Sequence, residues 1–196
     1  MTTLKNDNGI LSYDGRELGL RVDKPLLYGS LLLADDMAPE CYFTFMFQVP
    51  RKIEVKGGFV SGRPNYYILD ELSTKLADGF EEKLKTFRER YHIEFCLTES
   101  DDRIIRQILK SAGLKRYVIS PEEAKTDNVN ITLEKWFGAK NEKGEPAVII
   151  DANCNLLLTG DERAKRAVRN LMVCFERLVR ESIATGANFS EAAQRR

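Results

Sequence analysis

The sequence predicts an α+β fold: a mixed, mostly antiparallel sheet, two long amphipathic helices and one β-α-β-like unit. Residues 159–185 and 65–91 each place apolar side chains at the spacing of a single helix face. Residues 41–49, CYFTFMFQV, alternate instead with the period of two that is typical of a strand. No repeat or flexible linker separates these segments, so we expect one domain over residues 1–196, with a candidate seam near 120–128.

The N-terminal part is predicted to form strands. Residues 1–9 are expected to be frayed. Asp14-Gly15 readily adopts the positive φ angles of a hairpin turn, and it separates two short apolar stretches, 10–13 and 17–22. We therefore expect a hairpin there, followed at 26–34 by a buried strand, with a short core helix as the alternative.

A further pair of strands is expected next. In residues 41–49 the two faces differ in character. One face holds the phenylalanines Phe43, Phe45 and Phe47. The other face holds Tyr42, Thr44, Met46 and Gln48. Pro50-Arg51 is expected to turn the chain into a short strand at 52–56, and a loop over 57–64 would follow.

The middle of the chain is predicted to contain a long helix and the β-α-β-like unit. Residues 65–91 would pack on the early sheet through a narrow stripe: Leu69, Leu72, Leu76, Phe80, Leu84, Phe87 and Tyr91. Residues 92–98 and 116–119 are expected to be parallel strands joined by a helix over 100–112. That helix would stop at Gly113 and turn four side chains inward: Ile104, Ile105, Ile108 and Leu109.

The last third is expected to begin with a short helix at 120–123, where a serine cap, a proline and two acids occupy their preferred positions. Three strands would then form a meander separated by a polar loop over 138–146 and a tight turn. The three strands are expected at 128–137, 147–151 and 155–158. Residues 187–196 are expected to be a mobile tail.

Residues 159–185 predict the longest helix. Thr159 is expected to cap its N-terminus, and Asp161 and Glu162 place negative charge at the positive end of the helix dipole. Gly186 is expected to end it. The face predicted to be core holds Ala164, Ala167, Val168, Leu171, Cys174, Phe175, Leu178 and Val179.

Four arginines fall on the opposite side of this helix: Arg166, Arg169, Arg177 and Arg180. One interpretation is a solvated surface whose acids and bases pair locally. The other is a binding face for phosphate or an acidic partner, because a planar guanidinium matches these anions with two parallel hydrogen bonds. The four arginines are thus the predicted contact residues for a protein partner, with DNA or RNA as a further class of partner.

Composition limits the partners and the location of the chain. Thirty basic residues balance thirty acidic ones, so binding to nucleic acid or membrane would need a local patch. Four scattered cysteines, Cys41, Cys96, Cys154 and Cys174, and a single histidine predict no metal site, and no cofactor motif is present. The N-terminus lacks the apolar run of a signal peptide, so the sequence predicts a cytoplasmic protein without membrane contact.

One short motif resembles the E-x-K core of the PD-(D/E)xK nucleases. Glu54 and Lys56 fall on the same side of the predicted strand 52–56, and Asp36 or Glu40 would supply a second carboxylate. The resemblance implies a divalent metal held by the two acids, with the lysine positioning the attacking water. A solvent-facing strand pair is the alternative interpretation of the same residues.

A small cysteine enzyme is the remaining hypothesis. Cys154 lies in a polar turn between Asp151 and Asn155, and as a nucleophile it would need a base such as His92. The same turn needs Asp and Asn for its backbone geometry alone. Because serine-nucleophile and phosphate-loop motifs are missing, the sequence favours a non-catalytic binding or assembly protein over either enzyme.

Overall fold

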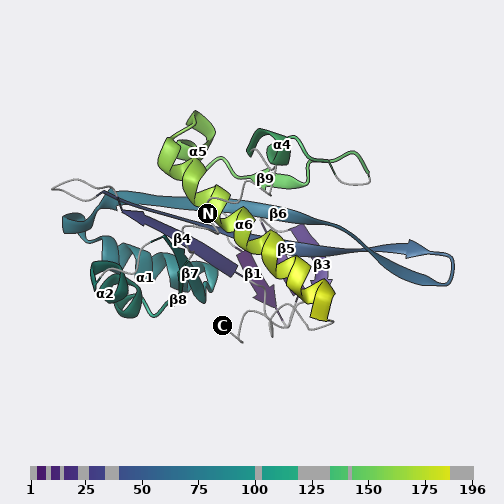
Figure 1. The fold of residues 1–196 in the computed structure, drawn as a ribbon, viewed down its shortest axis with the longest axis horizontal. Coiled ribbons are helices and arrows are strands. Elements are labelled where there is room, and N and C mark those ends of the chain that lie inside the picture. The colour runs from purple at the N-terminus through teal and green to yellow at the C-terminus, as the bar shows by residue number, and fades with distance from the viewer. Residues whose placement is uncertain are drawn as a thin grey trace.

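The structure, a computed structural model, describes residues 4–7, 10–13, 16–21, 27–33, 40–99, 103–118, 133–140 and 143–185. Within these residues the chain forms a three-stranded sheet and a larger six-stranded sheet with helices packed against it (Figure 1). The α+β class predicted from the sequence is confirmed. Several predicted features lie outside the described residues: the turn at 14–15, the helix at 120–123, the seam at 120–128, Gly186 and the tail at 187–196.

The six-stranded sheet has the order β8-β7-β4-β5-β6-β9. Its strands are β4 (Leu27–Leu33), β5 (Glu40–Val55), β6 (Gly58–Lys75), β7 (Phe95–Thr98), β8 (Lys115–Val118) and β9 (Val148–Ile150). β5 is antiparallel to β4 and to β6, whereas β7 and β8 continue parallel to β4 and β9 lies parallel to β6. The sheet is therefore mixed, with an antiparallel centre and parallel flanks.

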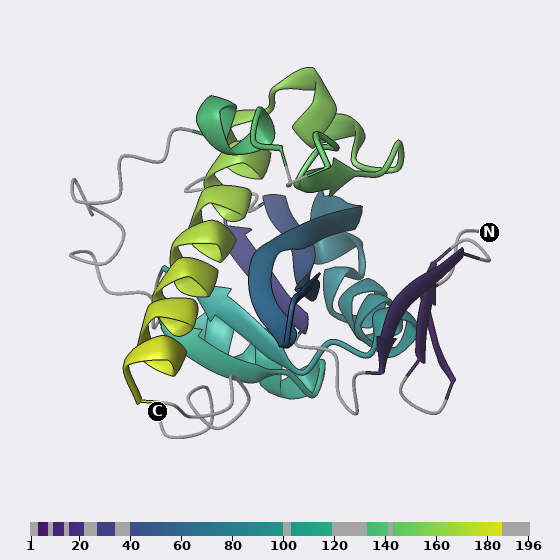
Figure 2. The ribbon, with the colours of Figure 1, turned by 90° about the vertical axis from the view of Figure 1, so that its right-hand side faces the viewer.

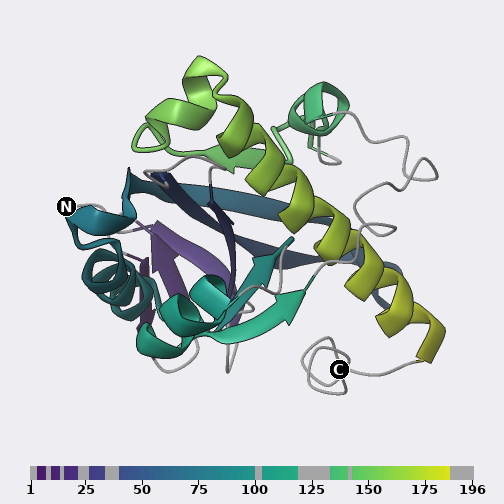
Figure 3. The ribbon, with the colours of Figure 1, turned by 60° about the vertical axis from the view of Figure 1, so that its left-hand side comes forward.

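Helices cover both faces of this sheet and create two hydrophobic cores (Figures 2 and 3). One face packs against α1 (Phe80–Tyr91) and α2 (Arg103–Ser111). The other packs against α4 (Leu133–Phe137), α5 (Asn155–Thr159) and α6 (Glu162–Thr185). The predicted alternation in β5 is confirmed where side chains are described: Phe43 and Phe45 enter the α1 core, and Tyr42 and Met46 enter the α6 core.

The N-terminal residues form a separate antiparallel sheet of β1 (Leu4–Asp7), β2 (Ile10–Tyr13) and β3 (Arg16–Arg21). The predicted hairpin is confirmed by the pairing of β2 with β3. The prediction that residues 1–9 are frayed was wrong for residues 4–7, because β2 offers a second edge and pairs with β1 from Leu4↔Tyr13 to Asp7↔Ile10.

The long helix predicted at 65–91 was wrong over its first half, where β6 continues to Lys75 and the helix α1 begins only at Phe80. A β-bulge explains the error. Between the pairs Thr44↔Glu71 and Met46↔Ile68, β6 carries two residues, Leu69 and Asp70, where β5 carries only Phe45. The extra residue brings Leu69 and Leu72 to the same core although they are three positions apart, a spacing that imitates a helix.

Pro50-Arg51 does not turn the chain, and residues 57–64 are not a loop. β5 runs through Pro50, and β6 already begins at Gly58 after a two-residue turn at Lys56 and Gly57. The ladder shifts register between Val49 and Arg51, so Pro50 lies at an irregularity in the strand pairing. A proline is tolerated there because it removes a donor that the ladder does not use.

The unit of β7, α2 and β8 is confirmed as two parallel strands joined by a helix, and Gly113 follows the helix with a φ of 71°. Three of the four isoleucine and leucine side chains predicted to point inward are buried: Ile105, Ile108 and Leu109. Ile104 is instead 52% exposed, because it lies one position outside the buried stripe.

The predicted meander of three strands was wrong. Within 128–137 the described residues form α4, with Trp136 packed 4.7 Å from Tyr66 between ring centroids. The strand β9 pairs with the distant β6, and residues 155–159 form the helix α5. These partners lie far away in the sequence, so the local pattern of apolar residues did not reveal them.

The start of α6 differs by one feature from the prediction. Asp161, not Thr159, caps it: Asp161 Oδ1 accepts hydrogen bonds from the backbone N–H groups of Arg163 (2.9 Å) and Ala164 (3.1 Å). The Thr159 hydroxyl donates back to the carbonyl of Asn155 in α5 (2.9 Å). The predicted core face is confirmed for its described members: Ala164, Ala167, Val168, Leu171 and Cys174.

We predict that Asp161→Ala lowers the free energy of unfolding by about 1 kcal/mol, whereas Thr159→Ala changes it by less than about 0.5 kcal/mol. Partial burial alone would raise the pKa of Asp161, but hydrogen bonds from Arg163 and Ala164 outweigh it and lower the pKa. Because its pKa is lower in the folded state, the Asp161 carboxylate stabilises the fold at pH values above its ordinary pKa of about 4. This stabilisation is lost as the pH falls through the pKa of the folded state. Urea denaturation should show the Asp161→Ala deficit in full at neutral pH and shrinking below about pH 4; a larger effect of Thr159→Ala would contradict the assignment.

Two neighbouring residues of β4 offer a matched test of the packing. A Cβ atom on Gly29 would collide with Cζ of Phe43, whose ring is held edge-on to Phe87 at 5.5 Å between ring centroids. We expect Gly29→Ala to cost about 1–3 kcal/mol of stability through overpacking. The Ser30 Oγ is buried without a hydrogen-bond partner among the described residues, so Ser30→Ala should be neutral or stabilising. Urea denaturation of both variants measures the two changes in the free energy of unfolding. Equal changes for Gly29→Ala and Ser30→Ala would contradict the described packing around Phe43.

Candidate functional site

The first candidate is the carboxyl end of β7, where ligands commonly bind in sheets with parallel strands. Glu99 follows Thr98, the last residue of β7, and its carboxylate faces α6. Arg166 approaches it with two guanidinium nitrogens, of which Nε lies 2.8 Å from Oε1, and Asn170 Nδ2 donates to the same oxygen at 2.5 Å. Both carboxylate oxygens are therefore already engaged by α6.

This contact involves one of the four arginines of the predicted binding face. Arg166 and Arg169 are both exposed, as predicted, but the charge of Arg166 is compensated by Glu99. Arg177 and Arg180 lie within α6, although the structure does not describe their side chains. Arg166 is thus paired with an acid, but this acid lies 67 positions away in the sequence and not on the same helix, as the local pairing would require.

A second polar cluster surrounds the bulge in β6. Glu71 accepts hydrogen bonds from the backbone N–H groups of Leu156 (2.5 Å) and Leu157 (3.2 Å) and from the hydroxyl of Tyr42 (2.9 Å). It therefore caps the N-terminus of α5. Burial, followed by the charge of Glu71, raises the pKa of Tyr42, so this phenol stays protonated and donates.

Asp70, the residue before Glu71, turns to the opposite layer. Its Oδ2 accepts a hydrogen bond from the Tyr91 hydroxyl of α1 at 2.7 Å, and Arg90 lies 3.8 Å from the same oxygen. Burial, followed by the hydrogen bond to Asp70, raises the pKa of Tyr91. The bulge thus sends two consecutive carboxylates to two different helices, where both hold the fold together. The sequence pattern did not reveal this pair because it predicted one helix over 65–91, which would contain both acids.

The residues of the E-x-K motif do not meet Glu40. Glu54 lies in β5 opposite Phe59, and Lys56 is exposed in the following turn. Glu40 begins the same strand, and at about 3.3 Å per residue it lies roughly 45 Å away. Glu40 instead pairs with Arg163 at 2.5 Å. Asp36, the other predicted carboxylate, lies outside the described residues.

Among the described residues, no group of three or more His, Cys, Asp and Glu side chains is placed to hold a metal ion. The residue pair required for a cysteine enzyme is also not assembled. Cys154 is fully buried in the α6 core, and burial, followed by the charges of Glu71 and Asp70, raises the pKa of its thiol. His92 follows α1 on the other side of the sheet, so it does not reach Cys154.

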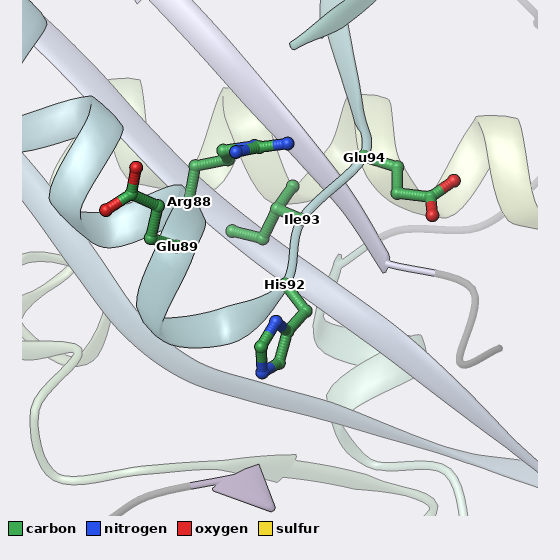
Figure 4. A pocket seen from close by; sticks show the side chains of 5 residues that line it. All are labelled: Arg88, Glu89, His92, Ile93 and Glu94. Carbon is green, nitrogen blue, oxygen red and sulfur yellow. The ribbon is translucent and has the colours of Figure 1, made fainter. Parts of the chain in front are cut away.

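His92 lines a surface hollow of about 390 Å³ with Arg88, Glu89, Ile93 and Glu94 (Figure 4). Its backbone φ of 54° follows from its place at the C-cap of α1, where its N–H donates to the Arg88 carbonyl. Figure 4 shows the two glutamates pointing to opposite sides and the imidazole pointing away from Arg88. No acid and base converge here, and the unusual φ has a structural cause.

The most distinctive feature is the far part of the β5–β6 hairpin, residues 49–65, which we call the arm. The ladder of β4 on β5 ends at Phe47, and that of β9 on β6 begins at Tyr66. In the described chain, the strands of the arm therefore pair only with each other, as far as the turn at Lys56 and Gly57. Figure 1 shows the arm projecting beyond the end of α6. At about 3.3 Å per residue it extends roughly 20–25 Å from the sheet.

Basic residues outnumber acidic residues in the arm. It holds four basic residues, Arg51, Lys52, Lys56 and Arg63, and one acid, Glu54. Its net charge is therefore +3, whereas the whole chain has a net charge of zero. Sequence analysis missed the arm because it divided this stretch into a turn, a strand, a loop and a helix. The signal available was the two-residue spacer between Val55 and Gly58, which favours a hairpin.

No protein-family model matches the chain, and the search of curated proteins finds no match either. In the part of the chain that the structure describes, none of the helices is both long and apolar enough to span a membrane. Function therefore has to be inferred from the residues themselves.

The Glu99 cluster predicts an asymmetric response to truncation. Glu99→Ala removes the acceptor of the amide of Asn170, which is 3% exposed, and should cost about 1–3 kcal/mol of stability. Arg166→Ala leaves the Glu99–Asn170 hydrogen bond in place and should cost at most about 1 kcal/mol. Arg169→Ala, an exposed control on the same helix, should stay within about 0.5 kcal/mol. Urea denaturation measures all three, and equal losses for Glu99→Ala and Arg166→Ala would contradict the described contacts.

Proposed function

We propose that the protein is a non-catalytic binding protein of the cytoplasm that contacts nucleic acid through the arm. The observation that carries the proposal is a ribbon of two strands that leaves the sheet with a net charge of +3 in a chain of zero net charge. Phosphate groups are the natural ligands of such a ribbon, because basic residues that neutralise them release condensed counterions.

The core supports this role because it fixes the base of the arm. β5 enters the arm directly from Cys41–Met46, where the side chains of Cys41, Tyr42, Phe43 and Phe45 are fully buried. An isolated two-stranded hairpin is marginally stable in water, so a continuous strand from a packed sheet is what gives the arm its direction. A positioned element loses less conformational entropy on binding than a flexible loop does.

The arm is a better candidate than the predicted arginine face. Arg166 already pairs with Glu99, so a phosphate would have to displace a carboxylate that Asn170 also holds. Lys56, at the tip of the arm, is exposed and stands beside two glycines that let a ligand approach the backbone. Arg169 remains exposed on α6, outside the arm, and is not a contact residue in this proposal.

A protein partner is the second candidate. The outer edges of the two strands in the arm pair with no other strand of the described chain, and open edges are sites where a partner strand can add. However, Pro50 and Pro64 lie in these strands, together with Arg51, Lys52 and Glu54 in β5 and Arg63 in β6. Prolines and charges on an edge are the means by which proteins avoid such pairing, so nucleic acid remains the preferred partner.

The test is fluorescence anisotropy of labelled single-stranded and duplex DNA and RNA against the purified protein across a salt series. The arm variant Arg51→Glu/Lys52→Glu should weaken binding by at least about tenfold and lower the slope of log affinity against log salt by about 2. The matched variant Arg166→Glu/Arg169→Glu should stay within about threefold of wild type, because Arg166 is compensated by Glu99.

Loss of binding in the α6 variant alone would move the interface to the helix and contradict the role of the arm. Absence of binding by the wild type at low salt would overturn the nucleic-acid proposal and leave the protein partner. Thermal unfolding of both variants controls for folding, and the arm variant changes residues beyond the ladders of β4 and β9.

A further inference from the structure

We infer that the arm is a ribbon that enters the major groove of double-stranded DNA, an inference that rests on the proposed function and specifies its partner. The dimensions of the arm agree with those of the major groove. Two strands lie about 4.8 Å apart, and a two-stranded β-ribbon fits the major groove of B-form DNA, which is about 12 Å wide and 8.5 Å deep. The arm extends roughly 20–25 Å from the sheet, so its tip reaches the groove floor before the body meets the backbone.

The composition of the arm excludes the other nucleic acids as preferred partners. Binding of single strands relies on aromatic side chains on which the bases stack, and the arm contains one aromatic residue, Phe59. Duplex RNA has a deep and narrow major groove that protein side chains do not enter. A basic ribbon with few aromatic residues therefore matches duplex DNA better than it matches RNA or a single strand.

The pairing within the arm keeps the ribbon slender. On two consecutive rungs a long basic residue is paired with a small residue: Arg51 with Gly62, and Lys52 with Ser61. The turn adds Gly57 and Gly58, both exposed. Basic residues contact phosphates and the guanine edge, and small residues beside them allow the backbone to approach the DNA closely.

The alternative is that the basic residues and prolines of the arm only prevent other strands from pairing with its edges. This explanation predicts no preference for any nucleic acid and no dependence on the length of the arm. One experiment that changes the length and the charge of the arm independently therefore distinguishes the two explanations.

The register supplies the two variants. Replacing residues 52–61 by Asn-Gly joins Arg51 to Gly62, which already face each other, through a two-residue hairpin turn. This short-arm variant loses Lys52, Lys56 and Glu54 and hence one net positive charge. Lys52→Ala loses the same net charge and keeps the full arm. Because the two net charges are equal, any difference between the two variants reports on the part of the arm beyond Lys52, that is, on the length of the ribbon and on Lys56 at its tip.

The measurement is competition against a labelled 20-base-pair DNA duplex at low salt, with unlabelled duplex DNA, duplex RNA and single-stranded DNA of the same sequence. Duplex DNA should compete at least about tenfold better than the others with wild type and with Lys52→Ala, which should lower the salt slope by about 1. The short-arm variant should lose this preference. The major-groove dye methyl green should displace the wild type, and the minor-groove ligand netropsin should not.

Equal competition by all three nucleic acids would overturn the groove inference and leave the proposed function standing, as would a short-arm variant that behaves like Lys52→Ala. Failure of the wild type to bind any nucleic acid at low salt would overturn both. Thermal unfolding confirms that the short-arm variant is folded, because the replacement begins beyond the ladders of β4 and β9.

Discussion

The structure depends on the burial of β5 on both faces. From Cys41 to Met46 every side chain is fully buried, with apolar groups alternating between two cores. A strand that is apolar on both faces requires a layer of helices on each side. The T-shaped contact of Phe43 with Phe87 fixes α1, and Tyr42 and Met46 form the floor beneath α6. The order of the layers therefore follows from this one strand.

The bulge in β6 distributes the polar groups between these layers. By inserting one residue opposite Phe45, it allows Asp70 to reach Tyr91 of α1 while Glu71 caps α5 across the sheet. In a regular strand, neighbouring residues also face opposite sides, but Leu69 and Leu72 would then not share a core. Because of the bulge, Asp70 and Glu71 reach opposite layers while Leu69 and Leu72 still pack against the same core. Two consecutive acids are thus bound within the fold, one in each layer.

Sequence patterns predicted those elements whose signal is local. The alternation in Cys41–Val49, the helix in 100–112 and the core face of α6 are all readable from spacing alone. The pattern failed where a distant contact decides the structure. α5 forms where the carboxylate of Glu71 caps it from 85 positions away, and the bulge disguised β6 as a helix. Strand propensity depends on such neighbours more than helix propensity does.

The same limit applies to the candidate site. The arginine face of α6 was visible in the sequence, but the acid that pairs with Arg166 is 67 positions away and its approach depends on the parallel pairing of β7 with β4. The arm was hidden for a different reason. Proline and glycine at its ends suggested turns, whereas in a long twisted hairpin they mark an irregularity and a tip.

The length of the arm has a physical consequence for any anionic partner. Since the chain has no net charge and the arm carries +3, the rest of the chain carries −3 and repels phosphates. At physiological salt the Debye length is about 8 Å, so Lys56, at the tip of an arm that extends roughly 20–25 Å, is screened from that negative body, whereas Arg51 and Lys52 lie nearer the base of the arm. A short basic patch on the same surface would be partly cancelled by the acids around it. Projection of the arm thus lets one chain present basic residues along a ribbon to DNA while its body stays acidic, and it favours an approach with the arm first.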